Sequence, residues 1–381
     1  MPHPAPVARS APASAVPGAR RSGIADSPLH GGRAPRWLFQ RMTLLAREMT
    51  CCIVEEFGAQ EVLSRLSDPY WFQAFGCVLG FDWHSSGLTT TVCGALKEGV
   101  KGLERELGLY VCGGKGRTSR RTPDEIAAFS QQNGLAPEPL VYASRTAAKV
   151  DSAAVQDGYQ IYHHSFFFTA AGSWTVVQQG MNEGNGYARR YHWLGETVDD
   201  FVCEPHAAVC SDLTGATLNL VAQESQPSRE LLPKIVREER PEVLLAELER
   251  IQHVEMPARH HLLAQDVHPR YIEKILLRTY ERQPEDFETL LGMEGVGAKT
   301  LRALSLVAEL VYHTPVSLRD PARYSFAHGG KDGHPFPVDR TTYDRSIEAL
   351  KRVLRRARLG QRETLEALKR LGSWEEEVVE G

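Results

Sequence analysis

No apolar run in this sequence approaches the roughly 20 residues that a membrane-spanning helix needs. The chain also lacks a strong charge of either sign: its formal net charge is −4 over 381 residues, which excludes a uniformly basic coat for nucleic acid. Seven cysteines are too few for a disulfide scaffold in a chain of this length, and no signal peptide is recognisable. We therefore expect a cytoplasmic protein that makes no contact with a membrane.

The composition changes along the chain and predicts an α+β protein. Residues 1–21 are rich in Ala, Pro, Ser and Arg and contain no acid, which is typical of a disordered extension. Residues 22–225 combine helical and β-rich segments, and the polar stretch 223–228 marks a boundary. We expect a mixed α/β domain over 22–225, an all-helical domain containing a helix-hairpin-helix over 226–373, and an acidic tail over 374–381.

Within the mixed domain, local patterns predict individual elements. Residues 34–66 have helical periodicity, with Gly58 as a C-cap. Residues 88–100 suggest a strand leading into a helix, and 107–114 a strand that ends on glycines. Thr122 followed by Pro123 predicts the capped start of a helix. Three β-rich runs predict an antiparallel sheet over residues 159–193. The apolar stripe of the first helix comprises Trp37, Met42, Leu45, Met49, Ile53 and Phe57.

The most informative segment, residues 286–309, reads DFETLLGMEGVGAKTLRALSLVAE. Glycine permits positive φ angles and a close approach of the backbone to a ligand. A helix that begins near Ala298 directs its unpaired N–H groups and its positive dipole end at an anion on the turn. This layout indicates a helix-hairpin-helix that holds a nucleic-acid phosphate; the alternative is a plain glycine turn between two core helices. The candidate contacts are Gly295, Val296, Gly297, Thr300 and Arg302.

A second segment, residues 113–121, combines glycines with four cations and no acid. The four cations are Lys115, Arg117, Arg120 and Arg121. Converging backbone amides and a helix that opens at Pro123 favour phosphate contact here, while the alternative is a solvated surface. The segment lacks the G-x-x-x-x-G-K-[ST] pattern, so it does not predict an NTP-binding loop.

The run YIEKILLRTYERQPEDFETLLGMEGVGAKTLRAL, followed by PVD and a helix, resembles the catalytic half of the helix-hairpin-helix DNA glycosylases. That resemblance implies that Lys299 is a nucleophilic amine and Asp339 its supporting carboxylate. The amine would form a Schiff base at C1′ of a damaged or baseless deoxyribose, and β-elimination would then break the strand. It implies a DNA repair enzyme, an abasic-site lyase or glycosylase, that needs neither metal nor cofactor. Its partner would be DNA, with RNA as the alternative.

The chain departs from the glycosylase pattern between Lys299 and Asp339. The insertion DPARYSFAHGGKDGHPFP lengthens the segment and carries His328, Lys331 and His334. Lys331 is thus an alternative nucleophile or phosphate contact. No cysteine follows Cys210, which excludes the four-cysteine iron–sulfur loop of some glycosylases.

From about residue 22 onward the chain also resembles an uncharacterised family, domain of unknown function 763. The resemblance is carried by LHGGRAPRWL, FDWHSSG, HHSFFF and DPARYSFAHGGKDGHPFPVDR. It implies no activity, so the functional expectation depends on the glycosylase-like part alone.

Two alternative functions remain open. FDWHSSG carries Asp82 and His84, and the strand pattern places His163 and His164 on opposite faces, so only one of these two histidines can join them. Such an Asp-His-His group would bind a divalent metal and make a nuclease, for which the hairpin would only dock the substrate. The third possibility is a non-catalytic nucleic-acid-binding protein.

Overall fold

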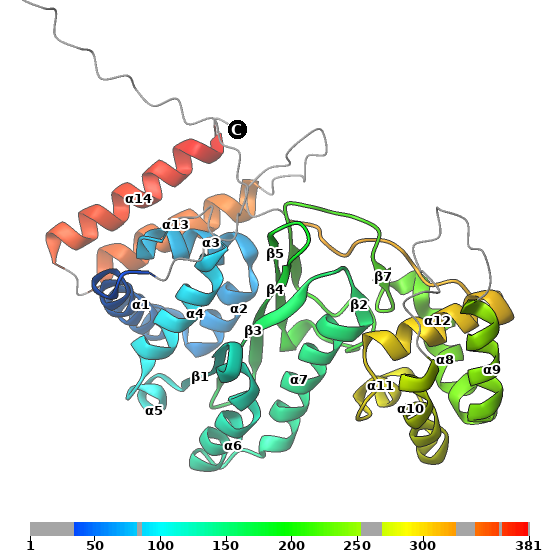
Figure 1. Ribbon diagram of the computed structural model, residues 1–381. Helices are drawn as coiled ribbons and strands as arrows, with labels where there is room; N and C mark the ends of the chain where they lie inside the picture. The colour runs from blue at the N-terminus through cyan, green and yellow to red at the C-terminus, as the bar shows by residue number, and fades with distance from the viewer. Residues whose placement is uncertain (1–33, 82–85, 253–268, 325–339, 358–359, 380–381) are drawn as a thin grey trace, which may run out of the picture.

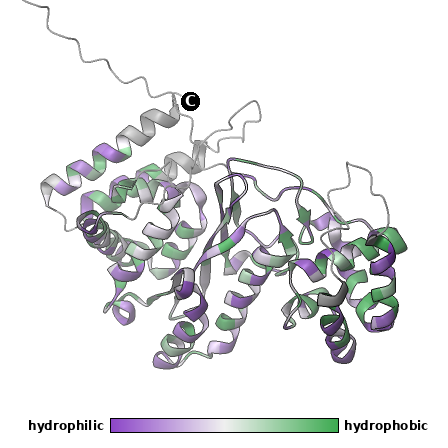
Figure 2. Ribbon diagram, in the orientation of Figure 1, coloured by the Kyte–Doolittle hydropathy of each residue, from purple (hydrophilic) through white to green (hydrophobic). Residues whose placement is uncertain are grey.

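A computed structural model describes residues 34–81, 86–252, 269–324, 340–357 and 360–379. A sheet runs through the middle of the molecule, with helices on both sides (Figure 1). Among the described residues no helix is both long and apolar enough to cross a membrane. Figure 2 shows hydrophilic and hydrophobic residues mixed along surface helices such as α6 and the coloured part of α14.

The central sheet has five strands in the order β1-β3-β4-β5-β6, and every neighbouring pair is antiparallel. The predicted antiparallel region over residues 159–193 is confirmed by β3, β4 and β5. A separate antiparallel pair joins β2 to β7. The strand bounds are β1 Leu109–Lys115, β2 Val155–Gln156, β3 Gln160–Thr169, β4 Trp174–Asn182, β5 Tyr187–Leu194, β6 Ala208–Cys210 and β7 Leu218–Asn219.

Alternate side chains along the strands enter two different cores. Leu109, Val111, Phe167 and Val177 pack with the N-terminal helices. The side chains that alternate with them along the strands face α6 and α7, and they belong to the same core as the C-terminal helices. Because both faces of the sheet are covered, its strands are buried almost throughout.

The N-terminal helices are α1 Arg36–Phe57, α2 Ala59–Ser67, α3 Pro69–Leu79, α4 Gly87–Val100 and α5 Glu104–Leu107. Helix α1 and its end at Gly58 are confirmed, although Trp37 and Phe57 at the two ends of the predicted stripe are exposed. The strand predicted at the start of residues 88–100 is wrong, because the whole segment is helical. Leu88, Val92 and Leu96 recur at helical spacing and are buried, so packing outweighs the β-propensity of the three threonines.

Helices α6 (Thr122–Gln132) and α7 (Pro137–Lys149) cover the second face of the sheet. A short 3₁₀ segment, η1 (Gly116–Arg121), precedes α6, and a π-helical turn, η2 (Val150–Ala154), follows α7. The helix predicted after residue 121 is confirmed, but Thr122 is not its cap. The Thr122 hydroxyl donates instead to the carbonyl of Ser119 (2.7 Å), and no side chain caps α6.

The C-terminal helices pack in two places. Helices α8 to α12 form the core beside α7, whereas α13 and α14 pack against α1 and α3 on the other side of the sheet (Figure 1). The sequence placed all of them in one helical region. The bounds are α8 Gln226–Glu238, α9 Pro241–Gln252, α10 Pro269–Arg282, α11 Phe287–Gly292, α12 Ala298–Tyr312, α13 Arg340–Arg356 and α14 Gln361–Val379.

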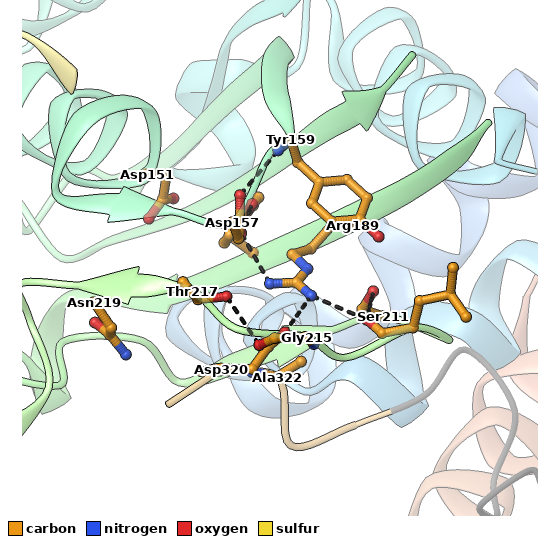
Figure 3. A network of polar contacts seen from close by, with 12 residues as sticks. Asp151, Asp157, Tyr159, Arg189, Ser211, Gly215, Thr217, Asn219, Asp320 and Ala322 are labelled. Carbon is orange, nitrogen blue, oxygen red and sulfur yellow. Dashed lines mark hydrogen bonds and ion pairs between the residues drawn. The ribbon is translucent and has the colours of Figure 1, made fainter. Parts of the chain in front are cut away.

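The chain that leaves α12 is fixed to the sheet by a buried arginine (Figure 3). Arg189 on β5 pairs with Asp157 (2.9 Å) and with Asp320 (2.8 Å), and Tyr191 donates to the same Asp157 oxygen. Beyond Asp320, the main chain of Tyr324 forms a parallel bridge with Cys210 at the end of β6. The first part of the predicted insertion, residues 320–324, therefore lies beside the end of β6.

Candidate nucleic-acid interface

The turn between α11 and α12 is held by its own backbone and by buried side chains. The Asp286 carboxylate caps α11 by accepting from the Thr289 N–H (2.7 Å). The Val296 N–H donates to the carbonyl of Met293 (3.2 Å), and the Val296 side chain is fully buried. This anchoring fixes the direction in which α12 begins.

Only one of the two glycines in the turn needs to be glycine for conformational reasons. Gly295 has φ 89°, and a Cβ atom there would lie 3.3 Å from Ile275 Cγ1. Gly297 has φ −141°, which any residue adopts, so this position does not use the positive φ that glycine permits. A Cβ atom on Gly297 would meet nothing within 4 Å, so open space lies beside it.

The N-terminus of α12 has no cap. Gly297 has no side chain to accept a hydrogen bond, and no acid lies in the first turn of the helix. Among the described residues, no acceptor is found for the main-chain N–H groups of residues 297–300. These groups and the helix dipole make the start of α12 electropositive.

The side chains around this N-terminus differ in how accessible they are. Lys299 is exposed, whereas Thr300 is 2% exposed and offers only its main chain. Arg302 is half-buried and donates to Gln156 Oε1 (3.0 Å). The Gln156 amide also donates to the carbonyl of Ala298 (2.9 Å), which attaches β2 to the first turn of α12.

The predicted pairing of Lys299 with Asp339 gains no support from the helix arrangement. Asp339 lies outside the described residues, as do His328, Lys331 and His334. Helix α13, which begins at Arg340, belongs to the core on the opposite side of the sheet from α12.

The basic segment at the end of β1 forms an exposed loop on a rigid base. Gly113 has φ 86°, and a Cβ atom there would lie 2.2 Å from the carbonyl oxygen of His164, so only glycine fits. Glu125 accepts from the Gly113 N–H (2.8 Å) and from Lys97 Nζ (2.7 Å). Lys115, Arg117, Arg120 and Arg121 are all exposed, and none forms an ion pair with a described residue.

The two strand histidines lie on opposite faces of β3, as predicted, and each has a buried hydrogen-bond partner. His164 lies between Ser144 Oγ (2.9 Å) and Gln178 Oε1 (2.8 Å), and burial lowers its pKa. His163 lies 3.0 Å from Ser165 Oγ, and burial, followed by the nearby His164 and Lys115, lowers its pKa to about 3. Both imidazoles are therefore neutral near pH 7. Asp82 and His84, the other members of the predicted metal group, lie outside the described residues.

A buried carboxylate that the sequence did not single out lies on the α7 side of the sheet. Asp151, in η2, is fully buried and accepts from Gln178 Nε2 (2.5 Å) and Trp193 Nε1 (3.0 Å). His206 Nε2 lies 2.5 Å from its second oxygen. With both oxygens bonded, the carboxylate has an architectural role. No group of three or more His, Cys, Asp or Glu side chains in the described ranges is arranged to hold a metal ion.

A family model described as a protein of unknown function, DUF763, matches residues 23–338. The chain belongs to this family. No curated protein and no solved structure is significantly similar to it. The DUF763 match includes the sheet, the basic loop and the α11–α12 turn, but it attaches no activity to any of them.

Among the described residues of this DUF763 chain, two exposed electropositive features differ from the buried polar groups of the sheet. One is the uncapped start of α12 with Lys299, and the other is the loop of residues 115–121. Among the buried groups, in contrast, His164 and Asp151 are hydrogen-bonded by neighbouring side chains, whereas His163 is bonded through Nε2 and its Nδ1 has no partner among the described residues.

Proposed function

We propose that this protein binds nucleic acid, and that the turn between α11 and α12 holds a backbone phosphate. The observation that carries this proposal is the set of main-chain N–H groups at residues 297–300, which have no acceptor among the described residues. Helix N-termini of this kind are ready anion sites, because the N–H groups and the dipole act on the same ligand. The open space beside Gly297 lets a phosphate reach them.

The exposed Lys299 adds a cation at the same place. A lysine in this position contributes to phosphate binding through its charge and through counterion release. Schiff-base chemistry would instead require an unprotonated amine, produced by desolvation or by a neighbouring cation. Lys299 is exposed on α12, whereas α13, which begins at the residue after Asp339, belongs to the core on the other side of the sheet. This arrangement supports phosphate docking by Lys299 better than strand cleavage.

The test is fluorescence anisotropy with a labelled DNA duplex and two glycine variants. Gly297→Val suits the extended backbone of that position and fills the space in front of the amides. The matched control is Gly292→Val, which also meets nothing within 4 Å but lies at the end of α11. We expect Gly297→Val to weaken binding by about tenfold or more, because hydrogen bonds to a charged group contribute about 1.5–3 kcal/mol each.

Equal affinity of the two variants would refute the docking role of the turn. Thermal unfolding of both should show that each retains the fold. An RNA duplex of the same sequence, measured in parallel, distinguishes DNA from RNA as the preferred ligand.

A further inference from the structure

We infer that the loop of residues 115–121 is a second contact surface for the same nucleic-acid backbone. This inference rests on the proposed function for the identity of the ligand, but not on the α11–α12 turn for its binding. The loop carries four exposed cations in seven residues: Lys115, Arg117, Arg120 and Arg121. Such a density of one charge on the surface of a chain with net charge −4 marks a local site for a polyanion.

The charge of the loop is not cancelled by its neighbours. Its four cations form no ion pair with a described carboxylate. Glu125, in the first turn of α6, is already bonded to Lys97 and to the Gly113 amide. Lys115 Nζ lies 5.5 Å from the centroid of the Tyr162 ring, a contact that positions the cation without neutralising it.

The loop is also held in place before any ligand arrives. Gly113 is in tight contact with β3, and Glu125 ties the backbone of β1 to α6. The Ser119 hydroxyl donates to the carbonyl of Gly116 (2.6 Å), and the Thr122 hydroxyl donates to that of Ser119. A preorganised set of cations loses less entropy on binding than a disordered basic tail does.

The loop and the turn lie within reach of one duplex. Gln156 is bonded to the first turn of α12, while Lys115 is paired with His163 in the sheet. Seven residue steps separate Gln156 from His163, and at no more than about 3.5 Å per step their Cα atoms lie within about 25 Å of each other. Adding about 5 Å across the strand pair gives an upper limit of about 30 Å between the Cα atoms of Gln156, which contacts the turn, and Lys115, which begins the loop. About ten base pairs of duplex cover that distance.

The experiment compares two triple variants on a labelled duplex of about 20 base pairs, which exceeds the upper limit. The loop variant is Arg117→Ala/Arg120→Ala/Arg121→Ala. The control, Arg36→Ala/Arg41→Ala/Arg105→Ala, removes the same charge from exposed positions on α1 and α5. Each phosphate contact contributes about 0.9 to the slope of log affinity against log salt. We therefore expect the loop variant to lose up to about three from this slope, together with tenfold or more in affinity.

The same loop substitutions in the Gly297→Val background separate this inference from the proposed function. A further loss of affinity there shows that the loop binds independently of the turn. If Gly297→Val leaves the affinity unchanged but the loop variant lowers it, the loop is a binding surface and the α11–α12 turn is not. If the loop variant binds and titrates with salt as the control does, the inference is overturned. Unchanged thermal unfolding of both triple variants confirms that only the surface was altered.

Discussion

The Arg189 guanidinium on β5 and the Asp320 carboxylate in the connection from α12 to α13 lie 2.8 Å apart, and both side chains are almost fully buried. They are 131 positions apart in the sequence. Asp320 also accepts from the main-chain N–H groups of Gly215 (2.9 Å) and Ala322 (2.8 Å), so it joins three separate segments. This pair fixes where the described chain that follows α12 meets the central sheet.

We expect Asp320→Asn to lower the free energy of unfolding by about 3 kcal/mol, because removing one partner leaves a buried charge poorly compensated. The value is at the low end of the range for buried pairs because Asp157 still faces Arg189. Urea unfolding measures the change. The control is Asp124→Asn, the same substitution at an exposed position in the first turn of α6, which should cost less than about 1 kcal/mol. A midpoint for Asp320→Asn close to that of the control would contradict the role given to this pair.

The local patterns of the sequence were sufficient for α1, for the antiparallel strands β3 to β5 and for the turn before α12. In each of these, the spacing of apolar residues agrees with the burial that the fold gives them, except at Trp37 and Phe57, the exposed ends of the α1 stripe. The start of α4 was missed because its threonines favour a strand locally, whereas contacts with α1 and the sheet decide the outcome.

The two placements of the C-terminal helices could not be predicted for a different reason. The periodicity of α12 and α13 shows that each has a buried face, but not which core it enters. That choice depends on contacts such as Arg189 with Asp320, between residues far apart in the sequence. Likewise, Gly295 is more constrained than Gly297 partly because it contacts Ile275. Ile275 lies on another helix, α10, so local sequence patterns do not reveal this contact.

Stability should fall as the pH drops below 6.5, partly because of His163. Its pKa is lowered in the folded state to about 3, so between pH 6.5 and 3 the unfolded chain binds this proton and the folded protein does not. His163→Asn removes this contribution. From pH 7 to pH 5, the stability of the wild type should therefore fall by about 2 kcal/mol more than that of the variant.

Chemical unfolding at a series of pH values measures this difference. The matched control is His313→Asn, because His313 is exposed at the end of α12 and asparagine tolerates its left-handed backbone. Parallel stability profiles for the wild type and His163→Asn would contradict a neutral, buried His163.

The two glycines of the turn should respond differently to alanine. Gly295→Ala puts a side chain at φ 89° and close to Ile275, so we expect a loss of about 1–2 kcal/mol in the free energy of unfolding. Gly297→Ala has room and an ordinary backbone conformation, so the change should stay within about 0.5 kcal/mol. Thermal unfolding of the two variants side by side measures the contrast. Equal losses would show that the turn has a different backbone conformation from the one described.

Lys299 is the residue for which docking and strand cleavage make opposite predictions. If the exposed amine only contacts phosphate, Lys299→Ala should lower the salt slope of binding by about one and leave no catalytic defect. The control is Lys369→Ala on α14, an exposed lysine on the other side of the sheet.

Borohydride treatment of the wild type with an abasic duplex tests the same contrast directly, and under docking it should trap no covalent adduct that depends on Lys299. Such an adduct, if it forms without a metal and disappears in Lys299→Ala, would instead establish lyase chemistry, because only a Schiff base is reduced to a stable bond. Cleavage that chelator abolishes and that Lys299→Ala retains would indicate the metal-dependent alternative.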